Sequence, residues 1–203
     1  MINKPSRRLE NKLQRQGFLN IAGIDEVGRG AWAGPLVAAA VILPHNYKIK
    51  DVKDSKKLSA KTREQLFLKI TKNAIQYSIS IISHNIIDQI GIQQANIKAF
   101  RNTITKLKIK PNYLLIDGKE ISTHPLPYEY LVSGDNKITS IAAASIVAKV
   151  TRDYIMQEYN KRFPEYGFSQ HKGYGTLFHR QAISKHGLTT IHRKSFKPIS
   201  KHT

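Results

Sequence analysis

Acidic residues stand at three places in this basic chain where the backbone is expected to turn. Asp25-Glu26 follows the apolar segment IAGI, Asp117 follows YLLI, and Asp135 lies in a Gly-Asp-Asn turn. The chain carries 33 Lys and Arg against 14 Asp and Glu, a formal net charge of +19, which favours binding of polyanions. Carboxylates that face a phosphate backbone repel it unless a cation lies between them. We therefore interpret the acids as ligands of a metal site in a protein that binds nucleic acid.

The chemistry expected of such a site is metal-assisted phosphodiester hydrolysis. Oxygen ligands suit Mg²⁺ or Mn²⁺, and phosphate oxygens complete the coordination. Two such ions about 3.5–4 Å apart lower the pKa of the attacking water and stabilise the leaving oxygen. The absence of Cys excludes disulfides, zinc–thiolate sites and a Cys nucleophile, and the eight His show no HExxH spacing. Neither Ser55 nor Ser145 lies in a nucleophile elbow, and the small size of Ser145 suits an Ala-rich helix.

The apolar pattern predicts the elements that carry these acids. Helices are expected where apolar residues recur at helical spacing, with Ser59 as the capping residue of the first. The expected helices cover residues 60–73, 86–107 with a break near Gly91, 139–162 and 176–186. Strands are expected in short apolar or alternating runs bounded by Gly, Pro or polar residues. The expected strands cover residues 18–25, 36–43, 75–81, 113–117 and 130–132.

The first strand is expected to end at the acidic pair. Neighbours in a regular strand point to opposite faces. Asp25 and Glu26 then share one metal only if the strand ends there, or if the two contribute differently. The glycines of the Gly28-Arg29-Gly30 segment permit a sharp change of direction directly afterwards.

Length and element order predict an α/β fold with a mixed sheet flanked by helices. The 203 residues suit a single domain, and the basic helical region from about residue 160 is expected to form a small C-terminal cap. The apolar runs 36–43 and 141–150 are too short to span a bilayer, and no apolar signal segment follows the basic N-terminal residues. We therefore expect a cytoplasmic protein with no membrane segment.

Six segments across residues 21–196 resemble prokaryotic type 2 ribonuclease H (ribonuclease HII) and keep the order of that family. They are AGIDEVGRGAWAGPLVAAAVIL, DSKKLS, LLIDG, GDNKITSIAAASIVAKVTRD, HKGYGT and IHRKSF. The resemblance implies a ribonuclease H-like fold and a metal-dependent endonuclease that cuts the RNA strand of RNA–DNA hybrids. It also implies incision 5′ of single ribonucleotides embedded in duplex DNA, which leaves 5′-phosphate and 3′-hydroxyl ends.

The resemblance also implies roles for individual residues. The four catalytic, metal-binding acids of the family fall on Asp25, Glu26, Asp117 and Asp135, with Mn²⁺ or Mg²⁺ as the cofactor. The substrate-binding Gly-Arg-Gly of the family falls on Gly28, Arg29 and Gly30, and its substrate-sensing Tyr falls on Tyr174. The departures are minor: Ala31-Trp32 replaces Pro and a smaller apolar residue, and Lys119 stands where Asn is frequent.

The sequence alone leaves two interpretations open for several of the expected substrate contacts. Arg29 and Lys56 either contact phosphate or are solvated surface charges, and Tyr174 either stacks on the deoxyribose after a ribonucleotide or is an ordinary packed loop residue. The expected partners are RNA–DNA hybrid and ribonucleotide-containing duplex DNA, bound by a monomer.

Two other functions fit part of the pattern. A basic nucleic-acid-binding protein without enzymatic activity explains the charge but leaves the acids without a reason. Another nuclease or a transposase on the same fold shares the acids and metals but not Gly-Arg-Gly and Gly-Tyr-Gly. Metal-dependent cutting would distinguish a ribonuclease H from the first alternative, and strict dependence on a ribonucleotide would distinguish it from the second.

Overall fold

The protein is built on a five-stranded mixed sheet, in a computed structural model that describes residues 5–45, 47 and 58–200. The strand order is β3-β2-β1-β4-β5. The strands are β1 (Ile21–Val27), β2 (Leu36–Ile42), β3 (Gln76–Ile82), β4 (Tyr113–Asp117) and β5 (Tyr128–Leu131). The pairs β1–β2 and β2–β3 are antiparallel, whereas β1–β4 and β4–β5 are parallel. The carboxyl ends of β1 and β4 therefore lie at the same edge of the sheet.

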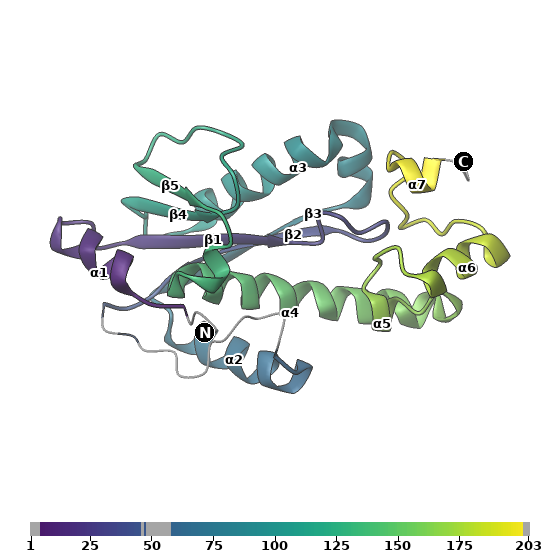
Figure 1. Cartoon of the computed structure of the whole chain (residues 1–203), viewed down its shortest axis with the longest axis horizontal. Helices are drawn as coiled ribbons and strands as arrows, with labels where there is room; N and C mark the ends of the chain where they lie inside the picture. The colour runs from purple at the N-terminus through teal and green to yellow at the C-terminus, as the bar shows by residue number, and fades with distance from the viewer. Residues whose placement is uncertain (1–4, 46, 48–57, 201–203) are drawn as a thin grey trace.

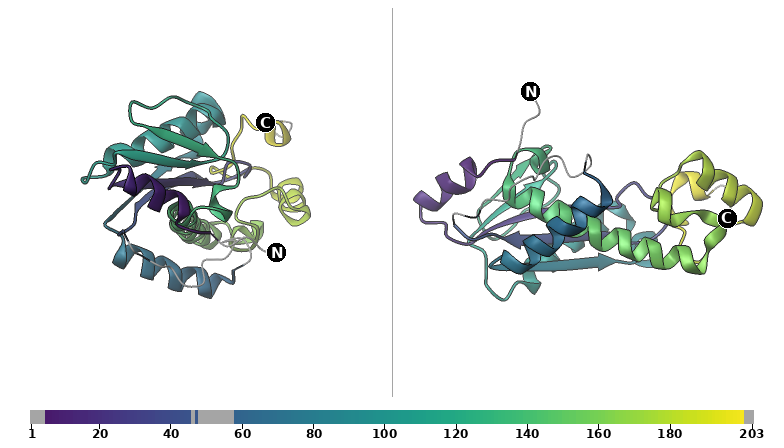
Figure 2. Two further views of the ribbon diagram at one scale, coloured as in Figure 1. Left: turned by 60° about the vertical axis from the view of Figure 1, so that its left-hand side comes forward. Right: turned by 90° about the horizontal axis from the view of Figure 1, so that it is seen from below.

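Helices cover both faces of the sheet. The helix α3 (His84–Lys106) packs on one face, and α2 (Ala60–Asn73) and α4 (Thr139–Arg162) pack on the other (Figures 1 and 2). Every residue of β2 is buried, with alternate side chains in the α3 core and in the α4 core. A Cβ at Gly23 of β1 would lie 2.2 Å from the carbonyl carbon of Ser140, so α4 approaches β1 this closely only over a glycine.

The three α-helices that cover the sheet form where the local signals predict them. The Ser59 hydroxyl accepts a hydrogen bond from the Thr62 amide at 3.1 Å and caps α2. The bounds of α4 are those predicted, and Gly91 interrupts α3 with a φ of 77°. The helix α1 (Arg8–Arg15) was outside the predicted elements.

Two strand predictions need correction. The first strand continues through Asp25 and Glu26 to Val27, because β2 still pairs with it there. The short strand expected at 130–132 covers Tyr128–Leu131 instead, paired with β4.

In β3 two polar side chains are buried and two large apolar ones are exposed, which is the reverse of the usual arrangement in a half-buried strand. Its small residues Ser78 and Ser80 are buried against α3, and the Ser78 hydroxyl donates to the Thr103 carbonyl at 2.6 Å. Tyr77 and Ile81 on the other face are exposed. Small side chains on the α3 side let that helix pack closely, so the apolar alternation does not mark the buried face here.

Short helices at the carboxyl end of α4 form the expected small cap. They are α5 (Phe168–His171), α6 (Leu177–His186) and α7 (Lys197–Ser200), with the 3₁₀ turn Pro164–Tyr166 before them (Figure 1). They enclose an apolar cluster of their own that includes Met156 of α4, Tyr166, Phe168 and Ile183. The predicted α/β class with a helical C-terminal cap is therefore confirmed. Within the described ranges, no helix is both long enough and apolar enough to span a membrane.

Candidate active site

The four predicted acids line one cavity of about 420 Å³ at the carboxyl ends of β1 and β4. Its lining comes from β1, β4, the 3₁₀ turn Gly134–Asn136, α4 and the loop before α6. The lining residues are Asp25, Glu26, Val27, Asp117, Asp135, Ser145, Lys149 and Tyr174. The tertiary structure thus brings together acids that lie in three separate segments of the chain.

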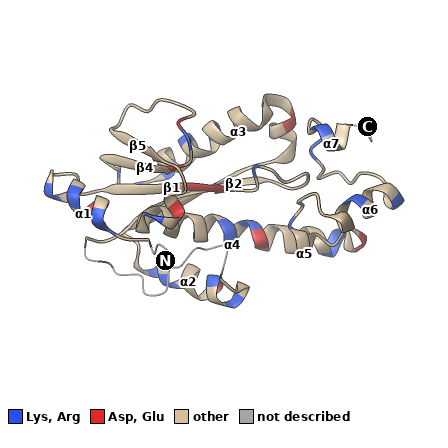
Figure 3. Ribbon diagram, in the orientation of Figure 1, with Lys and Arg blue, Asp and Glu red and all other residues tan. Residues whose placement is uncertain are grey.

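Differences in strand length expose the acidic pair at this edge. The β1–β4 pairing ends at Ile24 and Ile116, whereas the β1–β2 pairing continues to Val27. Asp25 and Glu26 therefore extend past the last residue pair that β1 shares with β4, and Figure 3 shows them as the acidic segment of β1. Asp25 is buried and Glu26 is half-buried, so the two acids have different surroundings although the strand does not end between them.

Short hydrogen bonds fix the orientation of the carboxylates. Asp117 Oδ1 accepts from the Gly134 amide at 2.6 Å, which ties the end of β4 to the turn that carries Asp135. Asp25 Oδ1 accepts from the Glu26 amide at 2.7 Å, and Asp135 Oδ1 accepts from the Asn136 side chain at 3.0 Å. Because these donors are main-chain groups or adjacent side chains, the acids are held by the local fold.

The acids repel one another in a poorly solvated place. Burial, followed by repulsion from Glu26, Asp117 and Asp135, raises the pKa of Asp25 well above its ordinary value. Burial, followed by repulsion from Asp117, raises the pKa of Glu26 to about 7, although the nearby charge of Arg29 acts in the opposite direction. A cation in the cavity would relieve this repulsion directly.

Three residues at the site were missed or misjudged from the sequence. Ser145 hydrogen-bonds Asp25 and lowers its pKa, so small size is not its only property in the α4 helix. Lys149 lies four residues later and also lines the cavity, and this spacing places both on one face of a helix. The amide of buried Asn96 on α3 hydrogen-bonds Glu26. The i, i+4 spacing could have identified the first two, whereas no local signal marks Asn96.

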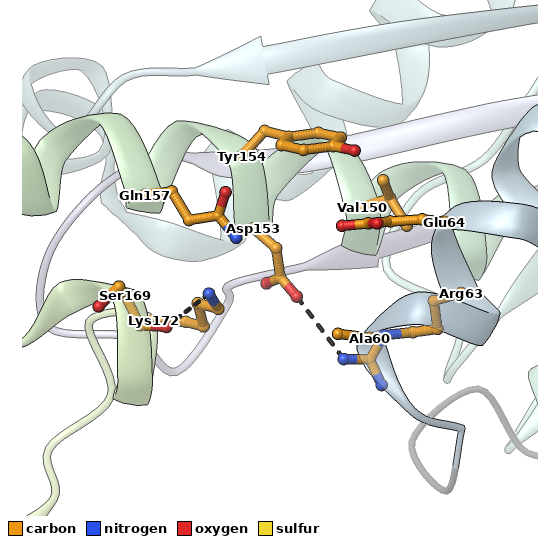
Figure 4. A pocket seen from close by; sticks show the side chains of 9 residues that line it. All are labelled: Ala60, Arg63, Glu64, Val150, Asp153, Tyr154, Gln157, Ser169 and Lys172. Atoms are coloured by element: carbon orange, nitrogen blue, oxygen red, sulfur yellow. Dashed lines mark hydrogen bonds and ion pairs between the residues drawn. The ribbon is translucent and has the colours of Figure 1, made fainter.

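Lys149 also connects the acid cavity to a second pocket of about 220 Å³ between α2, α4 and α5 (Figure 4). Its ammonium lies 2.6 Å from Asp153, which also faces Arg63 at 3.9 Å. Arg63 in turn donates to the Leu58 carbonyl at 2.6 Å, while Lys172 donates to the Ser169 carbonyl at 2.7 Å. Basic side chains thus continue outward from the acid cavity, with Asp153 between them.

Among the predicted substrate residues, Tyr174 lines the same cavity, and the Gly28-Arg29-Gly30 segment directly follows Val27, which also lines it. Gly28 has a φ of +93°, and a Cβ there would lie 2.2 Å from Arg152 Nε. Arg29 and Gly30 are exposed, and nothing lies within 4 Å of a Cβ built at Gly30. Tyr174 lines the cavity and leaves 38% of its surface exposed. Lys56 lies outside the described residues.

The donor set of the cavity fits a hard divalent cation. Four carboxylates supply only oxygen ligands, and their mutual repulsion is the kind that bound Mg²⁺ or Mn²⁺ relieves. Within the part of the chain that the structure describes, no three acidic or His side chains are already arranged to hold one ion.

Comparison with known proteins identifies the family. The family model described as "Ribonuclease HII" matches residues 22–199. Ribonuclease HII from Bacillus thuringiensis (strain Al Hakam) is 50% identical over 192 residues, which cover 95% of this chain and 74% of that protein. The chain belongs to the ribonuclease HII family. This membership confirms the predicted resemblance and supports ribonuclease H activity, the endonucleolytic cleavage of RNA in RNA–DNA hybrids.

Solved structures agree with the architecture. The crystal structure of ribonuclease H2 from Pyrococcus horikoshii OT3 matches with a TM-score of 0.77 and 25% identity, over 90% of this chain and 96% of that one. The ribonuclease HII of Archaeoglobus fulgidus, solved in a complex with PCNA, matches with a TM-score of 0.73 and 28% identity, over 88% and 96%. The mixed sheet flanked by helices is therefore a ribonuclease H-like fold.

Proposed function

We propose that this ribonuclease HII family member also incises duplex DNA on the 5′ side of a single embedded ribonucleotide. The products are 5′-phosphate and 3′-hydroxyl ends, and Mn²⁺ or Mg²⁺ is the cofactor. The observation that carries the proposal is the cavity that Asp25, Glu26, Asp117, Asp135 and Tyr174 line together. It combines a set of hard-metal ligands with an exposed aromatic ring in a chain of net charge +19.

Each acid has a distinct role in this proposal. Asp25 would be the central ligand, because it is buried and lines the cavity together with the other three acids. Asp117 and Asp135 would each hold a separate ion, and Glu26 would support one of the two ions directly or through water. When two ions are bound, they lower the pKa of the attacking water and stabilise the leaving 3′ oxygen. Ser145 keeps Asp25 oriented by its hydrogen bond to the carboxylate.

Recognition of the ribonucleotide is assigned to the two glycine-containing segments. The 2′-hydroxyl is the group that distinguishes ribose from deoxyribose. The backbone at Gly30 can approach a sugar closely, because the space around its α-carbon is open. The Tyr174 ring is partly exposed in the cavity, and in this proposal it stacks on the deoxyribose that follows the ribonucleotide. We propose that a single domain acting as a monomer makes these contacts, with the C-terminal cap supplying Tyr174.

The test uses labelled duplex DNA that contains one ribonucleotide, incubated with Mg²⁺, Mn²⁺ or EDTA beside an all-DNA control. We expect a metal-dependent nick 5′ of the ribonucleotide and no nick in the control. Asp25→Asn should nearly abolish the nick while the protein still binds the duplex. Binding without cleavage under either metal would support the non-enzymatic alternative. Cleavage of the all-DNA control would support a nuclease of different specificity.

A further inference from the structure

Three histidines lie together in the C-terminal cap, directly behind the turn that carries Tyr174. The His179 side chain is 0% exposed and that of His192 is 1% exposed. Their Nε2 atoms are 3.0 Å apart, and the His171 ring stacks on the His179 ring with centroids 4.5 Å apart. None of the three lines the acid cavity. The contacts of their ring nitrogens show what the group does.

The hydrogen bonds determine which nitrogen of each ring carries the proton. The Thr189 amide donates to His192 Nδ1 at 2.9 Å, so that nitrogen is an acceptor. A neutral His192 ring then carries its proton on Nε2 and donates it to His179 Nε2. His179 must accept there, so its own proton is on Nδ1, which donates to the Tyr174 carbonyl at 3.0 Å. The chain of bonds runs in one direction, from Thr189 to the main chain of Tyr174.

The third ring holds the residue before Tyr174. The Gly173 amide donates to His171 Nδ1 at 3.1 Å, and His171 Nε2 donates to the Tyr166 carbonyl at 2.6 Å. Imidazoles therefore bind the backbone on both sides of the Tyr174 α-carbon. Burial lowers the pKa of His179 to about 4, so this ring is neutral at pH 7 as the bonding pattern requires. The same cause lowers the pKa of His192 to about 4.

The backbone at this turn decides where the Tyr174 ring lies. The ring is 5.6 Å from the Arg152 guanidinium carbon. Arg152 is itself fixed, because it donates to the carbonyls of Pro35 at 2.9 Å, Lys172 at 2.9 Å and Ala33 at 3.2 Å. The ring thus rests on a rigid cation, while its main chain is held from behind by the histidines.

We propose that the His192–His179 pair is a positioning device that sets Tyr174 for recognition of the ribonucleotide junction. The pair does not contact the substrate, so its effect on specificity passes through the Tyr174 main chain. This inference rests on the proposed function, in which the Tyr174 ring reads the junction. It assigns a role in specificity to side chains inside the cap.

Two substitutions of one residue separate positioning from general structural support. The amide of His179→Asn occupies the place of Nδ1, so it keeps a donor for the Tyr174 carbonyl and loses the bond to His192. The amide of His179→Gln occupies the place of Nε2, so it keeps an acceptor for His192 and loses the donor to Tyr174. Each variant loses one of the two bonds. A purely structural role therefore predicts similar effects for both.

The measured quantity is the ratio of kcat/KM on duplex DNA with one ribonucleotide to kcat/KM on a long RNA–DNA hybrid. We expect His179→Gln to lower this ratio by about two- to tenfold, the effect of one lost hydrogen bond, toward the value of Tyr174→Ala. His192 acts by fixing the tautomer in which His179 donates to Tyr174. The amide nitrogen of His179→Asn donates without that partner, so this variant should keep the ratio near that of the unsubstituted protein. Equal ratios for the two His179 variants would overturn the proposal.

The outcomes distinguish this inference from the proposed function. If Tyr174→Ala lowers the ratio and His179→Gln does not, the histidine pair is not the positioning device and the junction role of Tyr174 stands. If Tyr174→Ala leaves the ratio unchanged, the junction role fails and the inference fails with it. Long-range ¹H–¹⁵N spectra of the unsubstituted protein add a test that needs no variant to fold. A proton on His179 Nε2 at pH 7 would overturn the bonding scheme.

Discussion

Replacement of Glu26 by Gln should stabilise the metal-free protein at alkaline pH. Burial and repulsion from Asp117 raise the pKa of Glu26 from 4.5 to about 7 in the folded protein. Each pKa unit corresponds to about 1.4 kcal/mol, so this displacement corresponds to about 3 kcal/mol. Because the folded pKa lies above the unfolded one, the contribution to stability is present below pH 4.5. It is lost as the pH rises through about 7.

Thermal unfolding in EDTA at pH 4.5 and pH 8 measures this effect. At pH 8 the Glu26→Gln variant should be more stable by about 3 kcal/mol, which raises Tm by roughly 6–12 °C for a chain of this size. At pH 4.5 the two proteins should unfold at similar temperatures, since Glu26 is then largely protonated in the folded state. Added Mn²⁺ should raise the Tm of the unsubstituted protein more than that of the variant, because the variant lacks one ligand.

The matched control is Glu158→Gln, which changes the same residue type at a surface ion pair with Lys161. Glu158 is largely exposed, and its removal should change stability little at either pH. An equal gain for Glu26→Gln at both pH values would show that the gain does not come from ionisation. No gain at pH 8 would refute the electrostatic account of the cavity.

Four further predictions concern the sheet, the cap and the substrate. Gly23→Ala should destabilise the protein by more than about 4 kcal/mol in urea unfolding, because its Cβ meets the Ser140 backbone. Gly30→Ala, which adds a Cβ in open space, should leave the unfolding midpoint nearly unchanged but weaken binding of ribonucleotide-containing duplex. Burial lowers the pKa of His179 and of His192 from 6.5 to about 4 in the folded protein. The free energy of unfolding should therefore fall as the pH drops from 6.5 towards 4, because the unfolded chain binds protons that the two buried rings do not. Unchanged unfolding over this pH range would contradict the lowered pKa values. Affinity for RNA–DNA hybrid should fall steeply with added salt, and a flat titration would argue against multiple phosphate contacts.

Local chemistry determined several elements of this protein. The Ser59 cap, the interruption at Gly91 and the apolar pattern of α4 act within a few residues of chain, so the sequence predicts them without knowledge of the fold. The four acids were identifiable for a similar reason, because each follows an apolar run or lies in a turn. Their functional assignment came from the resemblance to a family. The comparisons confirmed that resemblance, and the roles of the individual acids stay a prediction.

Contacts between distant segments were decided only by the tertiary structure. The first strand continues past the acidic pair because β2 pairs with it there, which the residues around Asp25 do not reveal. The helix α1 has only two apolar residues, Leu9 and Leu13, and its Glu10 accepts a hydrogen bond at 3.0 Å from the Ser140 amide at the start of α4. Ser78 and Ser80 face the core because α3 packs over them.

The surroundings of the site also depend on contacts between distant segments. Asn96 on α3 meets Glu26 on β1, and His192 reaches Tyr174 through His179, across segments that no short-range pattern connects. Periodicity and capping report the preferences of one segment at a time. The partners of a buried polar side chain depend on how whole elements pack. The sequence alone therefore identified the acids, and the packing of the elements decided what surrounds and orients them.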